Sequence, residues 1–201
     1  MEGLLETERI LQHLYLVGTA SAATIIAGIA LGVLAYIHKW MRPAILWVAD
    51  ILQTIPVLAL LGFVMIFFGA GSTTVIIGIV LYSLLPVIRN TYIGLEGVNP
   101  AVKEAAEGMG MTKPQALIKV ELPLAAPIIF AGIRIAVVTS IGIAVFGSVV
   151  GGGGLGASIN RAILIQDMPR LLTATAALMA MAIVFDIALG AVEKHLRTYR
   201  N

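Results

Sequence analysis

Long segments without charged side chains dominate this sequence. Leu14 to Ile37, for example, is 24 residues long and contains no Asp, Glu, Lys or Arg. The hydrocarbon core of a bilayer is about 30 Å thick, and a helix of roughly 20 residues crosses it. Because lipid cannot hydrogen-bond to an exposed backbone, a segment of this length crosses a membrane as a helix.

Five segments meet this criterion, and they are residues 14–37, 44–68, 73–88, 124–150 and 171–192. Only 12% of the residues in the chain are charged, about half of the roughly 25% found in soluble domains. This composition excludes an ordinary soluble domain. The sequence therefore predicts an all-α membrane protein in which residues 1–201 form a single domain of five transmembrane helices.

The basic residues predict the orientation of these spans. If the N-terminus lies outside, nine of the 13 lysines and arginines fall on the cytoplasmic side and three fall outside. Short cytoplasmic loops are enriched in Lys and Arg. The sequence therefore predicts an outside N-terminus, a cytoplasmic C-terminus and a cytoplasmic segment at about 99–122.

That polar segment carries dense helix start and stop signals. Asn99 is a favourable N-cap and is followed by Pro100, which suits the first helical position. Gly110 favours a left-handed helix end, and Thr112 with Gln115 forms a capping-box pattern. We expect two short helices with a bend, although these signals alone are equally typical of a solvated loop with helical tendency.

The spacing within this segment closely resembles the EAA loop of ABC importer permeases. The matching residues are Glu104-Ala105-Ala106, Gly110, Val120 and Leu122-Pro123; the family usually has Ile where this chain has Val120. The resemblance implies a type I ABC importer permease fold, in which this loop couples a cytoplasmic ATPase to the membrane helices. It also implies that Glu104, Ala105, Ala106 and Gly110 form the docking surface.

The resemblance extends to the permeases for glycine betaine, carnitine and choline, in the family of binding-protein-dependent transport inner membrane components. It is carried by the segments ADILQTIPVLALLGF (49–63), LYSLLPVIRNTYIGL (81–95), AGIRIA (131–136) and GGGGLG (151–156). This implies a plasma-membrane importer for a quaternary ammonium solute, with a second permease copy or paralogue, ATPase subunits and an external binding protein as partners.

The chain offers no catalytic constellation of its own. It contains no G-x-x-x-x-G-K-[ST] sequence and no cysteine, so we expect ATP and Mg to bind the partner ATPase. No cofactor, metal or nucleic acid is expected on this chain. Alternative functions are an ABC permease for an amino acid such as methionine, a stand-alone carrier or channel, or a membrane scaffold.

A glycine cluster follows the fourth predicted span. Gly151, Gly153 and Gly156 satisfy G-x-G-x-x-G, but no strand precedes them, which argues against a dinucleotide site. We expect a flexible external turn. The resemblance implies that the cluster acts as an external gate or contacts the binding protein, through Gly151, Gly152, Gly153, Gly154 and Gly156.

Three charged residues interrupt the predicted spans: Asp50, Arg134 and Asp186. Charges in a bilayer are costly and face protein or water. We expect Arg134 to pair with one or both acids and to hold three helices together near the cytoplasmic side. The alternative is that these residues line a substrate or ion pathway.

Small residues, prolines and histidines yield further expectations. The pairs Gly28 with Gly32 and Gly147 with Gly151 are G-x-x-x-G patterns, which favour close packing of helices within the chain over a subunit interface. The prolines at 56 and 86 are expected to kink or loosen their helices. The histidines at 13, 38 and 195 lie near span ends, where we expect interfacial anchoring.

Overall fold

The computed structural model describes residues 2–198, and their side chains from residue 7 to residue 196. Arg197 and Arg200, which entered the orientation argument, lie outside the described side chains. Within residues 2–198, nine α-helices follow one another, with a π-helical turn (Leu117–Glu121) before α7 and a 3₁₀ turn (Gly147–Val150) after it. The α-helices are α1 (Glu2–Ile37), α2 (Arg42–Thr54), α3 (Val57–Phe68), α4 (Ser72–Glu96), α5 (Pro100–Gly108), α6 (Lys113–Ala116), α7 (Leu122–Phe146), α8 (Gly154–Leu164) and α9 (Met168–Thr198).

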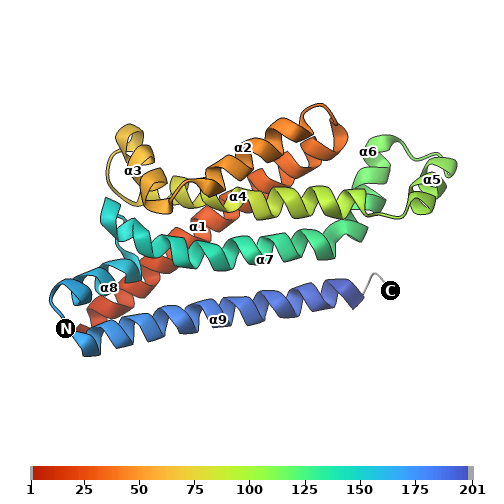
Figure 1. Ribbon diagram of the computed structural model, residues 1–201. Helices are drawn as coiled ribbons and strands as arrows, with labels where there is room; N and C mark the ends of the chain where they lie inside the picture. The colour runs from red at the N-terminus through yellow and green to blue at the C-terminus, as the bar shows by residue number, and fades with distance from the viewer. Residues whose placement is uncertain (1, 199–201) are drawn as a thin grey trace.

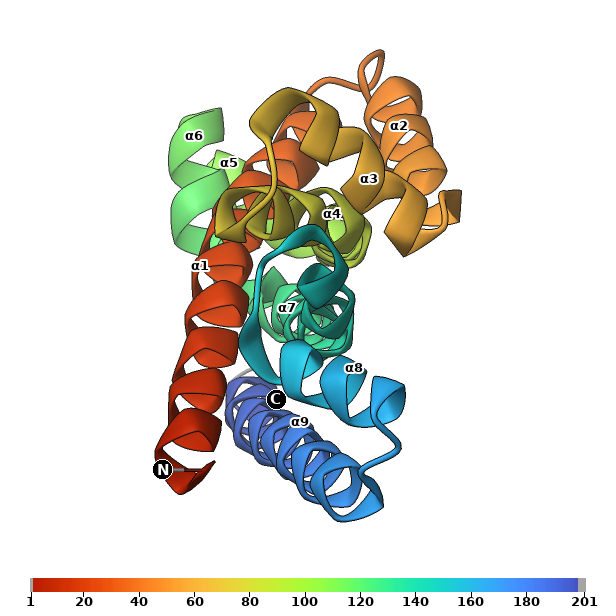
Figure 2. The same cartoon turned by 90° about the vertical axis from the view of Figure 1, so that its left-hand side faces the viewer.

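Four long helices, α1, α4, α7 and α9, run along the length of the molecule (Figure 1). Each is long and apolar enough to cross a membrane. They contain the first, third and fifth predicted spans and residues 124–146 of the fourth, whose last four residues form the 3₁₀ turn. In the end-on view of Figure 2, α7 lies between α4 and α9, with α1 and α8 beside it.

The second predicted span, residues 44–68, is not one straight helix. It consists of α2 and α3, whose axes differ by 105°. The break lies at Ile55, which is extended at φ −70° and ψ 130°, because a residue before proline avoids the helical region. Pro56 thus breaks its helix more sharply than a kink, whereas α4 continues through Pro86 without interruption.

Glycines bring α1 and α7 close to α4. A Cβ added to Gly28 would lie 2.6 Å from Val87 Cβ, and one added to Gly32 would lie 2.9 Å from the Ile88 carbonyl oxygen. In the second G-x-x-x-G pair, Gly147 with Gly151, a Cβ on Gly147 would meet Val75 of α4 at 2.6 Å. The predicted use of these G-x-x-x-G patterns in packing within the chain is therefore confirmed.

Gly132 of α7 packs closely against the backbone of α4 and gives a stability prediction. A Cβ at Gly132 would lie 2.6 Å from the Pro86 carbonyl oxygen and from Asn90 Cβ. We expect Gly132→Ala to separate the two helices and to destabilise the fold by about 1–3 kcal/mol, the usual cost of overpacking. Thermal unfolding of the purified chain in detergent measures this effect.

Gly142 provides the matched control on the same helix. It is exposed, and a Cβ there would meet no atom within 4 Å. Because alanine is the better helix former, Gly142→Ala should leave the melting temperature unchanged or raise it. Equal melting temperatures for the two variants would contradict the close packing of α4 and α7 at Gly132.

Different helices lie at the two ends of the molecule. The N-terminal end of α1 lies with α3 and α8 at one end, and α5, α6 and the C-terminal end of α9 lie at the other (Figure 1). The predicted polar segment and the C-terminal end of the last span therefore share a side. The helix α8 was not predicted, because its glycine-rich start resembles a turn.

Candidate functional site

The segment after α4 forms the two predicted short helices. The Asn99 side chain accepts a hydrogen bond of 2.9 Å from Ala101 N at the start of α5. Gly110 ends that helix with φ +80°, where a glycine avoids the strain of a side chain. At the next helix, Thr112 N donates to Gln115 Oε1 at 2.9 Å, completing the predicted capping box.

The predicted docking residues do not all face the same way. Glu104, Ala105 and Gly110 are exposed. Ala106, in contrast, is only 1% exposed and packs inside the chain. The prediction that Ala106 lies on the docking surface is therefore corrected, because its methyl group faces inward on α5. The exposed surface of α5 includes Glu104 and Ala105.

A polar cluster that the sequence did not reveal joins α5 to the spans. Lys103 Nζ donates to Tyr36 OH at 2.9 Å and to the Leu95 carbonyl oxygen at 3.0 Å. Tyr36 OH donates to Glu121 Oε2, and this carboxylate lies 3.7 Å from Lys103 Nζ. A pocket of about 680 Å³ lies beside the cluster, between the ends of α1 and α4 and the helices α5 and α6.

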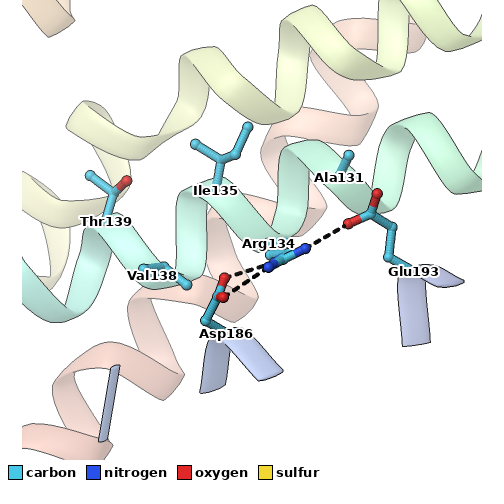
Figure 3. A pocket seen from close by; sticks show the side chains of 7 residues that line it. All are labelled: Ala131, Arg134, Ile135, Val138, Thr139, Asp186 and Glu193. Carbon is cyan, nitrogen blue, oxygen red and sulfur yellow. Dashed lines mark hydrogen bonds and ion pairs between the residues drawn. The ribbon is translucent and has the colours of Figure 1, made fainter. Parts of the chain in front are cut away.

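Arg134 and Asp186 form the intramembrane ion pair that the sequence predicted. The guanidinium of Arg134 binds both carboxylate oxygens of Asp186, at 2.7 and 2.8 Å (Figure 3). Its Nη1 also donates to Glu193 Oε2 at 3.1 Å. Asp186 and Glu193 lie about two turns apart on α9, with Gly190 between them, and a Cβ at Gly190 would come 3.1 Å from Arg134 Cζ. We call Arg134, Asp186 and Glu193 the charge triad.

Of the two acids that could pair with Arg134, Asp186 does so and Asp50 does not. Asp50 pairs with Arg89 at 2.6 Å, joining α2 to α4, and has no contact with Arg134 among the described ion pairs. The charge triad therefore connects two helices, α7 and α9, and not three. Sequence reasoning missed Glu193 because it ended the fifth span at Val192 and assigned the next residue to the cytoplasm.

The charge triad opens onto a groove of about 420 Å³. Ala131, Ile135, Val138 and Thr139 of α7 line the rest of it (Figure 3). The side chain of Arg134 is 33% exposed and that of Asp186 is 43% exposed, whereas that of Glu193 is 11% exposed. The triad thus lies at the surface of a single chain, at a level where a lipid-facing charge is costly.

The glycine cluster is packed and not a flexible turn. Gly154 N donates to Gln12 Oε1 of α1 at 2.9 Å, and a Cβ on Gly156 would lie 2.1 Å from the Val145 carbonyl oxygen. The residues Gly152, Gly154 and Gly156 are buried, Gly153 is partly buried, and Gly151 is exposed. These glycines allow α8 to pack closely against α1 and α7.

The expectation for His13 is also corrected. This side chain is completely buried, and its Nε2–H donates to the Ile141 carbonyl oxygen of α7 at 3.1 Å. His13 therefore joins two helices and is not an interfacial anchor, while His38 and His195 are exposed. Among the described residues, no group of three His, Asp or Glu side chains could hold a metal ion.

Comparison with known proteins assigns this architecture to a family. Residues 24–198 match the family described as binding-protein-dependent transport system inner membrane component. The osmoprotectant import permease protein OsmW of Salmonella typhimurium is 42% identical over 180 residues, which cover 87% of this chain and 84% of OsmW. The carnitine transport permease protein OpuCD of Listeria monocytogenes is 44% identical, with coverage of 89% and 80%.

Solved structures share the fold. A structure of the MetNI methionine ABC transporter in an inward-facing conformation matches with a TM-score of 0.88 and 21% identity, covering 97% of both chains. An amino acid ABC transporter crystallised with histidines matches with a TM-score of 0.78 and 20% identity, covering 96% of this chain and 95% of that chain. At this identity the likeness shows the fold alone.

The family match covers most of the chain, and OsmW aligns with a similarly large part of it. The EAA spacing lies in the short-helix segment between α4 and α7, at one end of a bundle of apolar helices. The chain belongs to the family of inner membrane components of binding-protein-dependent transport systems, and it is a multi-pass, helical membrane protein of the type I ABC importer permease fold.

Proposed function

We propose that this chain is the permease subunit of an ATP-driven importer for a quaternary ammonium solute such as glycine betaine, carnitine or choline. The observation that carries the cargo class is the 42–44% identity to permeases named for osmoprotectant and carnitine transport. The methionine transporter is only 21% identical. No covalent chemistry is assigned to the chain itself.

The energy comes from partner subunits in this proposal. Two cytoplasmic ATPase subunits bind ATP and Mg and dock on α5, with Glu104 and Ala105 at the contact and Gly110 ending the helix beside it. A second copy of this permease, or a paralogue, completes the pathway. An external binding protein delivers the cargo, and closure of the ATPase pair moves α5 and switches the helices between inward- and outward-facing states.

The proposed orientation places α5 in the cytoplasm and the N-terminal end of α1 outside. The excess of basic residues on the α5 side supports it. Because the chain lacks cysteine, Glu104→Cys introduces one thiol. We expect a membrane-impermeant maleimide to label it in inverted membrane vesicles and not in intact cells; labelling in intact cells contradicts this orientation.

The glycine cluster lies at the opposite end, which is the external end in this orientation. We assign Gly151 as its exposed contact point for a gate or for the binding protein. The packing of Gly152, Gly153, Gly154 and Gly156 against α1, α4 and α7 supports a role in holding α8 in place.

Reconstitution tests the proposed function. The complex purified with its companion subunits is placed in liposomes, and uptake of radiolabelled glycine betaine, carnitine, choline and methionine is measured with and without ATP. We expect ATP-dependent uptake of at least one quaternary ammonium solute that also requires the binding protein. Uptake of methionine alone would favour the amino-acid alternative, and uptake without ATP would favour a stand-alone carrier.

A further inference from the structure

A single lysine makes the side-chain hydrogen bonds that join α5 to the spans in the described part of the chain. Among the described residues, Lys103 is the side chain of α5 that hydrogen-bonds to the transmembrane helices. Its ammonium group contacts Tyr36 OH and the Leu95 carbonyl oxygen, and it lies 5.1 Å from the centre of the Tyr36 ring.

The partners of Lys103 come from three different spans. Tyr36 lies at the end of α1, Leu95 at the end of α4, and Glu121 at the last position before α7. The Glu121 side chain is only 10% exposed, and a buried carboxylate is stable only when it is paired. We call Tyr36, Lys103 and Glu121 the linkage cluster.

The surroundings of the linkage cluster allow α5 to move if this contact is lost. The helix is joined to its neighbours by short connections that contain Gly97 and Gly110. The π-helical turn Leu117–Glu121 separates α6 from α7, and such turns often occur at functional sites. The pocket of about 680 Å³ next to the cluster leaves space between α5 and the ends of the spans.

We propose that the linkage cluster is the mechanical connection through which displacement of α5 is transmitted to α1, α4 and α7 together. Lys103 acts as a positioning residue, since it holds α5 against the span ends. Without it, α5 pivots on its two glycine-containing connections and the spans do not follow. This inference rests on the proposed function.

The test measures coupling in the reconstituted complex as cargo taken up per ATP hydrolysed. Lys103→Met keeps the length of the side chain but removes its charge. The double variant Lys103→Met with Glu121→Gln also removes the carboxylate that would otherwise lose its cation, so that folding is preserved. Lys119→Met is the control, because Lys119 is exposed on the π-helical turn.

We expect both linkage variants to lower the ratio by about fivefold or more, the lower range of coupling between protein sites, and Lys119→Met to leave it unchanged. Lys103→Arg, which keeps the charge, should restore part of the ratio. If the wild-type complex transports and the double variant takes up a normal amount of cargo per ATP, the linkage is overturned and the proposed function stays intact. Absence of ATP-dependent uptake by the wild type overturns the proposed function itself.

A distance measurement separates transmission from simple stabilisation. Spin labels at Ala101→Cys on α5 and His38→Cys after α1 occupy exposed positions in a chain without native cysteine. In the wild-type complex the distance between them should stay the same with and without ATP. In the double variant the distribution of distances between the two labels should broaden when ATP binds. A distance that is equally narrow in both proteins and both states contradicts the proposal.

Discussion

Replacing Ala105 by tryptophan is expected to abolish ATP-dependent uptake while leaving the fold of the chain intact. Ala105 is exposed on α5, so a large side chain there meets no atom of the chain's core. In the proposed complex it lies at the ATPase contact, where its small size permits close approach. We expect ATPase binding to weaken by at least about 30-fold, which corresponds to about 2 kcal/mol, the size of an interface hot spot.

Two further variants identify the cause of this loss. Ala106→Trp, one residue away, places the same bulk at a buried position and should lower the melting temperature of the chain itself. Lys119→Trp places it on an exposed neighbouring turn and should change neither binding nor melting. Affinity for the ATPase is measured by titration in detergent. Wild-type affinity for Ala105→Trp would show that α5 docks through another face.

Removing the charge of Arg134 is expected to reduce the amount of correctly assembled permease in the membrane several-fold, because loss of folding stability lowers protein abundance. Arg134→Ala leaves Asp186 and Glu193 of α9 without the guanidinium that binds both. Asp186 then loses the cation that binds both of its carboxylate oxygens, and an acid without its counter-charge is strongly disfavoured within a membrane. Arg134→Lys should have an intermediate effect, since lysine cannot form the bidentate contact.

The matched control is the other helix-to-helix ion pair. Arg89→Ala breaks the contact with Asp50, and the side chains of this pair are 48% and 46% exposed. Its effect on membrane abundance should be smaller than that of Arg134→Ala, because Arg89 binds one acid and Arg134 binds two. Abundance is measured by immunoblotting of purified membranes, and assembly by co-purification with the companion subunits.

A neutral triple variant distinguishes a structural triad from a transport pathway. Arg134→Met with Asp186→Asn and Glu193→Gln removes all three charges together, so that no charge of the triad is left behind without its partners. We expect this variant to recover membrane abundance and uptake. Normal abundance of Arg134→Ala with complete loss of uptake would instead assign the triad to the pathway.

The sequence by itself determined the features that depend on local chemistry. Apolar runs of bilayer length predicted the long helices α1, α4, α7 and α9, because lipid leaves a single apolar segment few other conformations. Asn99, Gly110 and the Thr112–Gln115 pattern predicted α5 and α6, since capping groups act within a few residues. The EAA spacing predicted the family because it too lies within one short segment of the chain.

Only the tertiary structure decided which distant residues meet. Asp50 pairs with Arg89, 39 residues away, although the spans also contain Arg134, and charge alone does not distinguish between these partners. Arg134 reaches Glu193 across 59 residues because Gly190 leaves room beside it. Such contacts depend on how helices rotate and cross, and no local pattern encodes that geometry.

The same limit applies to which face of a helix is covered. Ala105 and Ala106 are adjacent and identical in type, yet one is exposed and the other is buried. The sequence predicted a kink at Pro56, but only the structure shows the 105° angle between α2 and α3 and the contact of α3 with α4. Local chemistry thus determined the helices and their ends. Packing between helices decided which residues face the partner, the membrane or each other, because burial depends on neighbours that are far away in the chain.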